Sequence, residues 1–342
     1  NISFKVLVIK FLIDRTILLV LKLFGIATIL FFIIQSLPAD PAAVAAGPDA
    51  RPEQIRQIRI DLGLDKPVII QYLNYIKGLI RGDLGKSLIT REKIIDELKL
   101  RFPATLELSI IAAFVVVLLS IPLGVISSLK RNSFIDYSTR FFVITGVAIP
   151  PFIIALILQL LFSQYFDIFP LEGRLDAEMI PPKFITGFYT IDSLINGNFD
   201  KFLSALNHLF LPVISLAFGR LAVGTRFTRI GMIETLREQY ILVAESKGLT
   251  KRRIIFKHAL PNAIIPVIAM LGVQIGFLLS GAVLVEVVFT WPGLGRYAVD
   301  SVLSFDYYAV IGSTLLIAII FVTSNTLVDI LYTKFDPRVS LN

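Results

Sequence analysis

The chain has 342 residues, of which 55% are hydrophobic and 17% charged, with a net charge of +7 and a mean hydropathy of +0.78. This composition excludes intrinsic disorder, which needs low hydrophobicity, and it falls short of the roughly 25% charged residues of soluble domains. The absence of Cys and the presence of only two His exclude thiolate chemistry and disfavour a metal site. A polytopic membrane protein is therefore expected, with no metal bound by this chain.

Six apolar stretches are long enough, or nearly so, to cross a hydrocarbon core of about 30 Å, which takes about 20 helical residues. They are Thr16–Leu37, Leu106–Leu129, Phe141–Phe166, Leu209–Thr225, Ala263–Val285 and Tyr307–Val328. The first is too long for the apolar region of a signal peptide, so we expect a retained span. The third contains Pro150-Pro151, which predicts a kink or a boundary between half-helices. The fourth is the weakest, because it is short and contains Arg220.

The distribution of basic residues supports all six spans. Without the fourth, nine basic residues between Arg220 and Lys257 would lie outside, against the positive-inside rule. We therefore expect an all-α integral membrane protein with six transmembrane helices and both termini in the cytoplasm. Its expected parts are a tail and first span (1–37), an external segment with short helices (38–105), and a five-helix core (106–342) with a cytoplasmic loop (226–262).

Two short helices are expected in the first external segment. Pro52 suits the first position of a helix, and Gly63 is typical of a helix end. A second helix is predicted from Pro67 to Leu79. Gly85-Lys86-Ser87 resembles the end of a phosphate-binding loop, but the full motif needs Gly where this chain has Ile80. We therefore expect no ATP site in this chain.

The cytoplasmic loop 226–262 has the most informative pattern. Leu236, Tyr240, Val243 and Ala244 fall on one face of an expected helix, and Glu245 falls elsewhere. Lys247 lies in its last turn, Gly248 is the expected left-handed terminator, and Thr250 is placed to cap a second helix, Lys251–Leu260. The pattern fits equally an amphipathic helix on the lipid surface and a docking element for a cytoplasmic partner.

A resemblance to a known family favours the docking element. The stretch YILVAESKGLT from Tyr240, followed by HALPNA from His258, resembles the coupling loop of ABC importer permeases, most closely the dipeptide/oligopeptide and nickel branch. The general pattern has Glu-Ala-Ala where this chain has Leu242-Val243-Ala244, and Ile where it has His258. The peptide branch commonly shows this Tyr and this His-Ala pair. Further similar segments are LPADP (37–41), DLGLDKP (61–67), GDLGKS (82–87), RFPATLEL (101–108), EVVFTWPGLG (286–295) and FDPR (335–338).

The resemblance implies a type I ABC importer permease fold in the cytoplasmic (inner) membrane of a prokaryote. This subunit would form, with a homologous second permease, the translocation path for short peptides. It would work with two cytoplasmic ATPase subunits, which bind ATP and Mg, and with an extracellular or periplasmic substrate-binding protein. The chain itself would have no catalytic residue, cofactor or nucleic-acid partner. The residues coupling it to the ATPases would be Leu236, Tyr240, Val243, Ala244, Glu245, Lys247 and Gly248.

Two groups at the fifth span are further candidates. Gly272, Gly276 and Ser280 form a small-residue row, which serves either close packing within one bundle or a permease–permease interface beside the pore. Gln274 is expected to bond between helices rather than to bind substrate. At the external end lie Glu286, Trp291, Pro292 and Gly293. They form either an interfacial anchor with a turn or, as the resemblance implies, an external gate or a contact with the binding protein.

Three alternatives remain open at this stage. The same importer class carries oligosaccharides, nickel or glutathione, and the sequence does not choose among these substrates. An ion-coupled secondary carrier is disfavoured, because the chain shows no internal repeat and no charged residue at a predicted mid-membrane position. An intramembrane hydrolase would need a paired nucleophile and base, and His208 and His258 lie at predicted membrane edges.

Overall fold

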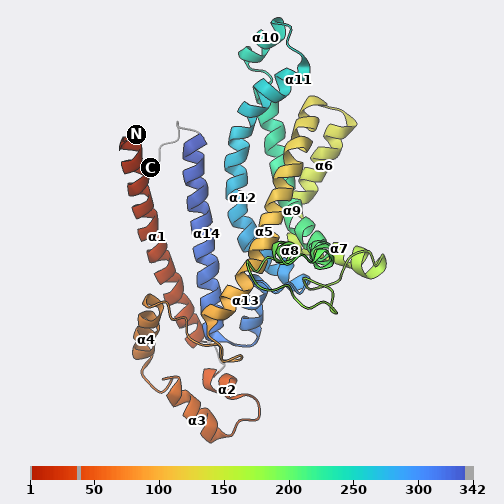
Figure 1. Ribbon diagram of the computed structural model, residues 1–342. Coiled ribbons are helices and arrows are strands. Elements are labelled where there is room, and N and C mark those ends of the chain that lie inside the picture. The colour runs from red at the N-terminus through yellow and green to blue at the C-terminus, as the bar shows by residue number, and fades with distance from the viewer. Residues whose placement is uncertain (1, 37–39, 336–342) are drawn as a thin grey trace.

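The computed structural model describes residues 2–36 and 40–335, and this part of the chain is helical, with no strand (Figure 1). Side chains are described there except for 2–12, 34, 266, 269, 271–273, 275–277, 279–281 and 327–335. Five long helices run side by side: α1 (Ile2–Gln35), α5 (Ile94–Leu129), α9 (Phe199–Thr235), α12 (Leu260–Val288) and α14 (Tyr307–Phe335). α9 packs against α5 and α12, α12 against α14, and α14 against α1.

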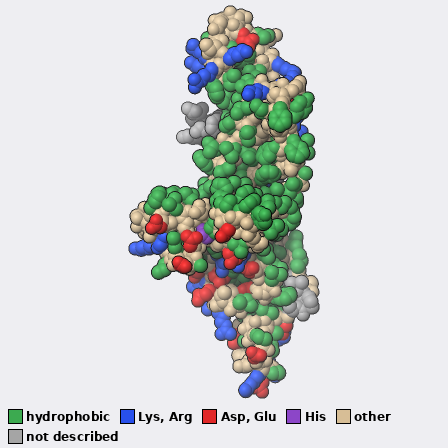
Figure 2. All heavy atoms as spheres, turned by 90° about the vertical axis from the view of Figure 1, so that its right-hand side faces the viewer, with side chains coloured by type: hydrophobic (Ala, Val, Ile, Leu, Met, Phe, Trp, Pro, Cys, Tyr) green, Lys and Arg blue, Asp and Glu red, His purple; other side chains and the backbone are tan. Residues whose placement is uncertain are grey.

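Four helical segments among the described residues are long and apolar enough to cross a membrane: Ile13–Ile33, Ile94–Leu129, Phe199–Thr235 and Tyr307–Thr326. The weak fourth span of the sequence therefore lies in a helix of 37 residues, about 55 Å long. The fifth predicted span lies in α12, which has 29 residues. The first predicted span ends at Leu37, which is outside the described residues. Figure 2 shows a broad hydrophobic band between two charged ends, as a bilayer requires.

The third predicted span is not one straight helix. α6 (Phe134–Ala148) is followed by α7 (Pro151–Leu158) and the π-helical segment η1 (Gln159–Tyr165), and the two parts meet at an angle of 106°. The cause is local: Pro150 disfavours a helical Ile149, whose φ and ψ are −94° and 122°, and Pro151 starts the new helix. Of the two expectations for this site, a kink or a boundary between half-helices, the structure shows the boundary.

The first external segment contains α2 (Pro41–Ala46), α3 (Pro52–Asp61) and α4 (Val68–Ile80). Pro52 is the first residue of α3, and Gly63 follows that helix with a φ of +67°, so both predicted helix signals are confirmed. The segment is fixed to the bundle at the start of α14. There the buried Asp306 accepts hydrogen bonds from the hydroxyl of Ser87 and, at 3.2 Å, from the backbone N–H of Leu88.

The second external segment is attached to α5 by a buried ion pair. Arg174 pairs with Glu107, and both side chains are almost fully buried. The guanidinium also lies 3.6 Å from the ring centre of Tyr189 and donates to the carbonyl of Gly187. Glu107 additionally accepts from the backbone N–H and the hydroxyl of Thr190, at 2.9 and 2.6 Å. These additional hydrogen bonds offset part of the cost of burying the two charges.

A second carboxylate orders the same segment. Asp192, in α8 (Tyr189–Ile195), accepts hydrogen bonds from the hydroxyl and N–H of Thr186 and from the N–H groups of Ile185 and Gly187. Burial by itself raises the pKa of Asp192, but these hydrogen bonds outweigh it and hold the pKa below its ordinary value. The loop between α7 and α9 is therefore a folded cover on the end of the bundle opposite α10.

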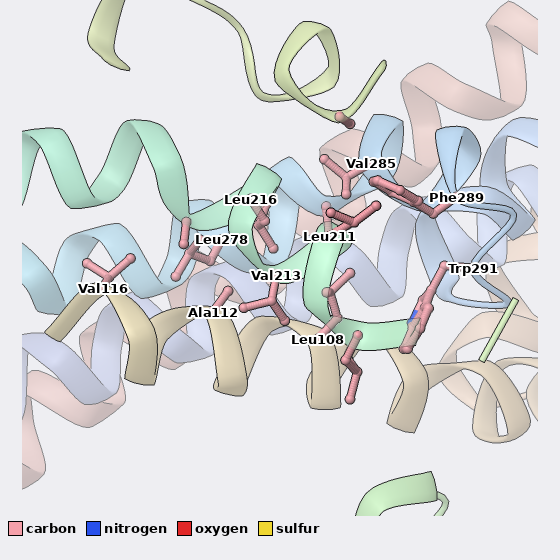
Figure 3. Packing of buried hydrophobic residues seen from close by; sticks show 14 of the residues in the cluster. Leu108, Ala112, Val116, Leu211, Val213, Leu216, Leu278, Val285, Phe289 and Trp291 are labelled. Carbon is pink, nitrogen blue, oxygen red and sulfur yellow. The ribbon is translucent and has the colours of Figure 1, made fainter. Parts of the chain in front are cut away.

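The main hydrophobic core lies between α5, α9 and α12 (Figure 3). α5 contributes Leu108, Ala112 and Val116, spaced four residues apart on one face. α9 and α12 contribute the facing side chains: Leu211, Val213, Leu216, Leu278 and Val285. Phe289 and Trp291, which follow α12, close the external end of this core.

Small residues allow α9 to approach its neighbours closely. A Cβ atom added at Gly124 of α5 would lie 2.5 Å from the Cβ of Thr228 and 2.8 Å from the carbonyl oxygen of Thr225, both in α9. A Cβ at Gly231 of α9 would lie 2.8 Å from the carbonyl oxygen of Ala263 in α12. Helix pairs in membranes gain their packing energy from such close contacts. These positions therefore set the distances between the central helices.

We expect Gly124→Ala to lower the thermal unfolding midpoint of the purified protein. Overpacking costs about 1–3 kcal/mol, more than the about 1 kcal/mol that Ala gains over Gly in a helix, and a backbone oxygen cannot move aside. Gly25→Ala is the matched control, because nothing lies within 4 Å of a Cβ at Gly25. Equal midpoints for the two variants in the same detergent would contradict the close packing.

Candidate functional site

The loop 226–262 forms a compact projection at the end of the bundle where α9 and α12 meet. α9 ends at Thr235, and α10 (Gln239–Ser246) follows after a short turn. Next come α11 (Lys251–Arg253), the π-helical segment η2 (Ile254–Ala259) and α12. Figure 1 shows α10 and α11 at one extreme end of the molecule. A short helix held between two long helices can pass a displacement on to both of them.

The predicted helical face of Leu236, Tyr240, Val243 and Ala244 is not formed as expected. Leu236 is the C-terminal cap of α9, and its N–H bonds to the carbonyl of Met232, so Leu236 does not belong to α10. Residues 236–238 contain no Gly or Pro, so the sequence pattern predicts one continuous helix through Leu236. The structure shows instead that α9 ends at Thr235 and that α10 begins at Gln239.

The two faces of α10 lie in different surroundings. Ile241 and Ala244 are buried in a cluster with Met232 and Ile254, against which Leu236 also packs. The opposite side is open: Leu242 is 56% exposed and Val243 is 53% exposed. Ile241 and Leu242 were missed from the sequence, although their apolar character in the middle of the helix was a usable signal. α10 is therefore held to the bundle by one apolar face, and its second apolar face is exposed.

The end of α10 has the predicted chemistry. Gly248 has a φ of +75°, in the left-handed region that favours glycine, and no atom lies within 4 Å of a Cβ placed on it. Thr250 caps the next helix, since its hydroxyl accepts from the N–H of Arg253. Glu245 and Lys247 are exposed beside Gly248. The predicted turn between two helices is confirmed, although the second helix is only α11 followed by η2.

Tyr240 links α10 to the start of α12. Its hydroxyl lies 2.9 Å from the amide nitrogen of Asn262, and that amide also donates to the carbonyl of His258 at 2.9 Å. The His-Ala-Leu-Pro-Asn stretch is thus bonded directly to the helix before it. A displacement of α10 will therefore act on the beginning of α12.

The external end of α12 contains the second group of candidate residues. Glu286 is fully buried and accepts hydrogen bonds from the hydroxyl of Thr105, at 2.7 Å, and from the N–H of Arg296, at 3.0 Å. Thr105 in turn accepts from the N–H of Leu294, the first residue of α13 (Leu294–Leu303). Glu286 thus joins the starts of α13 and α5 to the end of α12.

The turn after α12, from Trp291 to Gly293, is also largely buried. The indole N–H of Trp291 donates to the carbonyl of Ala104 at 3.0 Å, and its side chain is 1% exposed. Gly293 is buried because its Cα faces the carboxylate of Glu286, where a Cβ would lie within 2.4 Å. Pro292 alone of the four predicted residues keeps partly exposed surface. Three of the four therefore offer almost no surface to a second protein in this conformation.

Inside the apolar part of the bundle, Gln274 makes the expected bond between helices. Its side-chain oxygen accepts from Arg220 of α9 at 2.6 Å. A charged residue at this depth must face protein or water rather than lipid. The other candidates of this span, Gly272, Gly276 and Ser280, have backbones in α12, but their side chains lie outside the described part of the structure.

Comparisons with known proteins agree with this arrangement. Residues 120–341 match the family described as binding-protein-dependent transport system inner membrane component, and residues 8–109 match the description of the N-terminal part of such a membrane component. The two matches together span nearly the whole chain, including both candidate regions.

The chain is also similar to permease proteins of dipeptide transport systems. It is 42% identical over 321 residues to the probable D,D-dipeptide transport system permease protein DdpB of Escherichia coli K12, covering 94% of each chain. It is 40% identical over 334 residues to the dipeptide transport system permease protein DppB of the same strain, covering 96% of this chain and 98% of the relative.

A relative with a different named substrate is more distant. The glutathione transport system permease protein GsiC of Escherichia coli O6:H1 is 33% identical over 330 residues, covering 96% of this chain and 98% of the relative. The resemblance first seen in the loop 226–262 is confirmed over the full fold. The chain therefore belongs to the family of inner membrane components of binding-protein-dependent transport systems.

Proposed function

We propose that this chain is the permease subunit of an ATP-driven importer of short peptides, with α10 as its contact to an ATPase. The observation that carries the proposal is the pair of faces on α10: Ile241 and Ala244 anchor it to the bundle, while Leu242 and Val243 remain exposed at the outermost end. The substrate class follows the dipeptide permeases, which are more similar to this chain than the glutathione permease is.

The complete assembly in this proposal has four further subunits beyond this chain. A homologous second permease completes the translocation path, two cytoplasmic ATPases bind ATP and Mg, and an external binding protein delivers the substrate. The fold is the type I importer fold, with six spans and both termini in the cytoplasm of a prokaryote. Support for this orientation comes from the basic residues near α9 and α10, on the side opposite the folded external loops.

The substrate path in this proposal runs beside α9 and α12. Arg220 and Gln274 lie on these helices within the apolar part of the bundle and need a non-lipid surrounding. The turn from Glu286 to Gly293 acts as the external gate, since it joins α12 to α5 and can transmit a change between them. The small row Gly272, Gly276 and Ser280 faces the second permease.

Uptake by the reconstituted assembly tests the function. Vesicles containing this chain and its partner subunits should take up a labelled dipeptide only with both ATP and the binding protein. Excess unlabelled dipeptide should compete, whereas glutathione, nickel and oligosaccharides should not. Uptake without any ATPase would contradict the proposal in favour of a secondary carrier.

Gly248→Val should uncouple ATP hydrolysis from uptake. A β-branched residue in the left-handed region costs about 1–2 kcal/mol, which reduces the population of correctly oriented α10 roughly tenfold. Gly248→Asn is the control, since Asn tolerates this backbone region. We expect the Val variant alone to lose peptide uptake per ATP hydrolysed; equal ratios in both variants would argue against a role for this turn.

Leu242→Glu should release the ATPases from the complex, because a charge would be buried in an apolar interface. The matched control is Leu303→Glu, which changes a 73% exposed residue at the end of α13, on the external side. Co-purification of the ATPases with each variant is the measurement. Retention of the ATPases by the Leu242 variant would place their contact elsewhere.

A further inference from the structure

A basic groove lies between α6 and α9, below the projection formed by α10. The cavity has a volume of about 690 Å³ and is lined by five arginines and one carboxylate: Arg131, Arg140, Arg226, Arg229, Arg237 and Glu234. The positive-inside rule accounts for basic residues at this level, but it does not require five of them to converge on one cavity. The function proposed above uses none of them.

Two of the arginines are held in place by a buried carboxylate behind the groove. Asp136 is fully buried and pairs with Arg229 through two nitrogens, at 2.6 and 2.9 Å, and with Arg140 at 2.8 Å. Ser127 and the backbone N–H of Asn132 also donate to Asp136. One negative charge thus orients two guanidinium groups, and this wall of the groove keeps a net positive charge.

The other arginines that line the groove can donate hydrogen bonds to a ligand. Arg131, Arg226 and Arg237 are exposed, and no described carboxylate forms an ion pair with them. In addition, the Nε atom of Arg140 is buried and has no hydrogen-bond partner among the described residues. Guanidinium groups bind phosphate with paired, charge-assisted hydrogen bonds. The groove therefore has the chemistry of a phosphate site.

The inner part of the groove is apolar. Val143 and Ile144 lie one turn of α6 beyond Arg140, toward the membrane centre, and Ile230 and Ile233 line the α9 side. On α6, Phe141, Ile144 and Val147 continue along one exposed apolar face. From Thr225 to Glu234 the α9 wall extends about 14 Å along the axis. A phosphate site that opens onto an apolar track at this depth matches a phospholipid, with its headgroup among the arginines and its acyl chains along α6.

We propose that this groove binds the phosphate headgroup of an anionic phospholipid from the cytoplasmic leaflet. Basic pockets between transmembrane helices on the cytoplasmic side recognise such headgroups. An acidic segment of a partner protein would satisfy the arginines, but it would have no use for the exposed apolar track toward the membrane centre. The lipid is therefore the occupant that uses both parts of the groove.

Lipid retention by the intact purified importer tests the proposal, with phosphatidylglycerol and phosphatidylcholine as probes and native mass spectrometry as the measurement. The wild-type complex should retain phosphatidylglycerol in preference to phosphatidylcholine. Arg226→Gln with Arg237→Gln should weaken this binding roughly tenfold, as expected for the loss of charge-assisted hydrogen bonds. Neither residue belongs to the Asp136 network, so the fold should be retained.

Two comparisons separate the groove from general charge effects. Arg56→Gln with Arg81→Gln removes the same charge from exposed positions in the first external segment and should leave lipid binding unchanged. Arg226→Lys with Arg237→Lys keeps the charge without the planar fork and should recover part of the binding. Equal lipid retention in the two Gln variants would overturn the proposal.

Two other occupants of the groove, a free anion and a partner protein, would give different results in these experiments. Displacement of the lipid by an equal concentration of inorganic phosphate would identify a general anion site and overturn the lipid assignment. Since the chain has no cysteine, Thr139→Cys introduces a single thiol at an uncharged position that lines the groove. A cross-link from this position to a partner subunit, in place of protection by phosphatidylglycerol, would show that a protein covers the groove and would equally overturn the proposal.

Discussion

The close approach of α9 to its neighbours is the constraint on which the rest of the structure depends. α9 touches α5, α6, α7 and α12, and at Gly124 and Gly231 its contacts leave no room for a Cβ atom. In a bilayer, apolar side chains gain little from leaving lipid for another helix, so packing at short range must hold the bundle together. The basic groove and the folded cover formed by the loop before α9 both take their shape from this central helix, since the groove lies along its C-terminal half and the cover packs on its N-terminal half.

The loops at one end of the bundle and the helix α10 at the other are built on different principles. At the end opposite α10, polar side chains such as Glu107, Arg174 and Glu286 are buried and paired with groups from other segments, so the loops there behave as part of the core. At the opposite end, α10 is anchored through Ile241 and leaves Leu242 open. Burying polar groups with their partners gives a unique geometry, whereas an exposed apolar face needs another protein to complete it. The division fits a subunit that receives its motion from outside itself.

Features with a short-range cause could be predicted from the sequence, and features that depend on distant partners could not. Gly248 carries its own conformational signal, so its left-handed backbone followed from the pattern around it. Leu236 was wrongly placed on α10, because the break after α9 depends on packing rather than on a helix-breaking residue. Leu242 was passed over because a surface that is apolar but exposed looks like core in a one-dimensional pattern. The bonds of Asp136 to Arg229 join residues 93 positions apart, and no local rule brings them together.

The tie between the external ends of α5 and α12 has a mechanical consequence. Trp291 and Glu286 join these helices near one end, through Ala104 and Thr105, while α10 acts on α12 near the other end, about 40 Å away along a helix of 29 residues. The joined end is a fixed point about which the rest of α12 can rotate. For a rotation of α12 about that point, the displacement would grow steadily along the helix and would be largest at the end that carries α10.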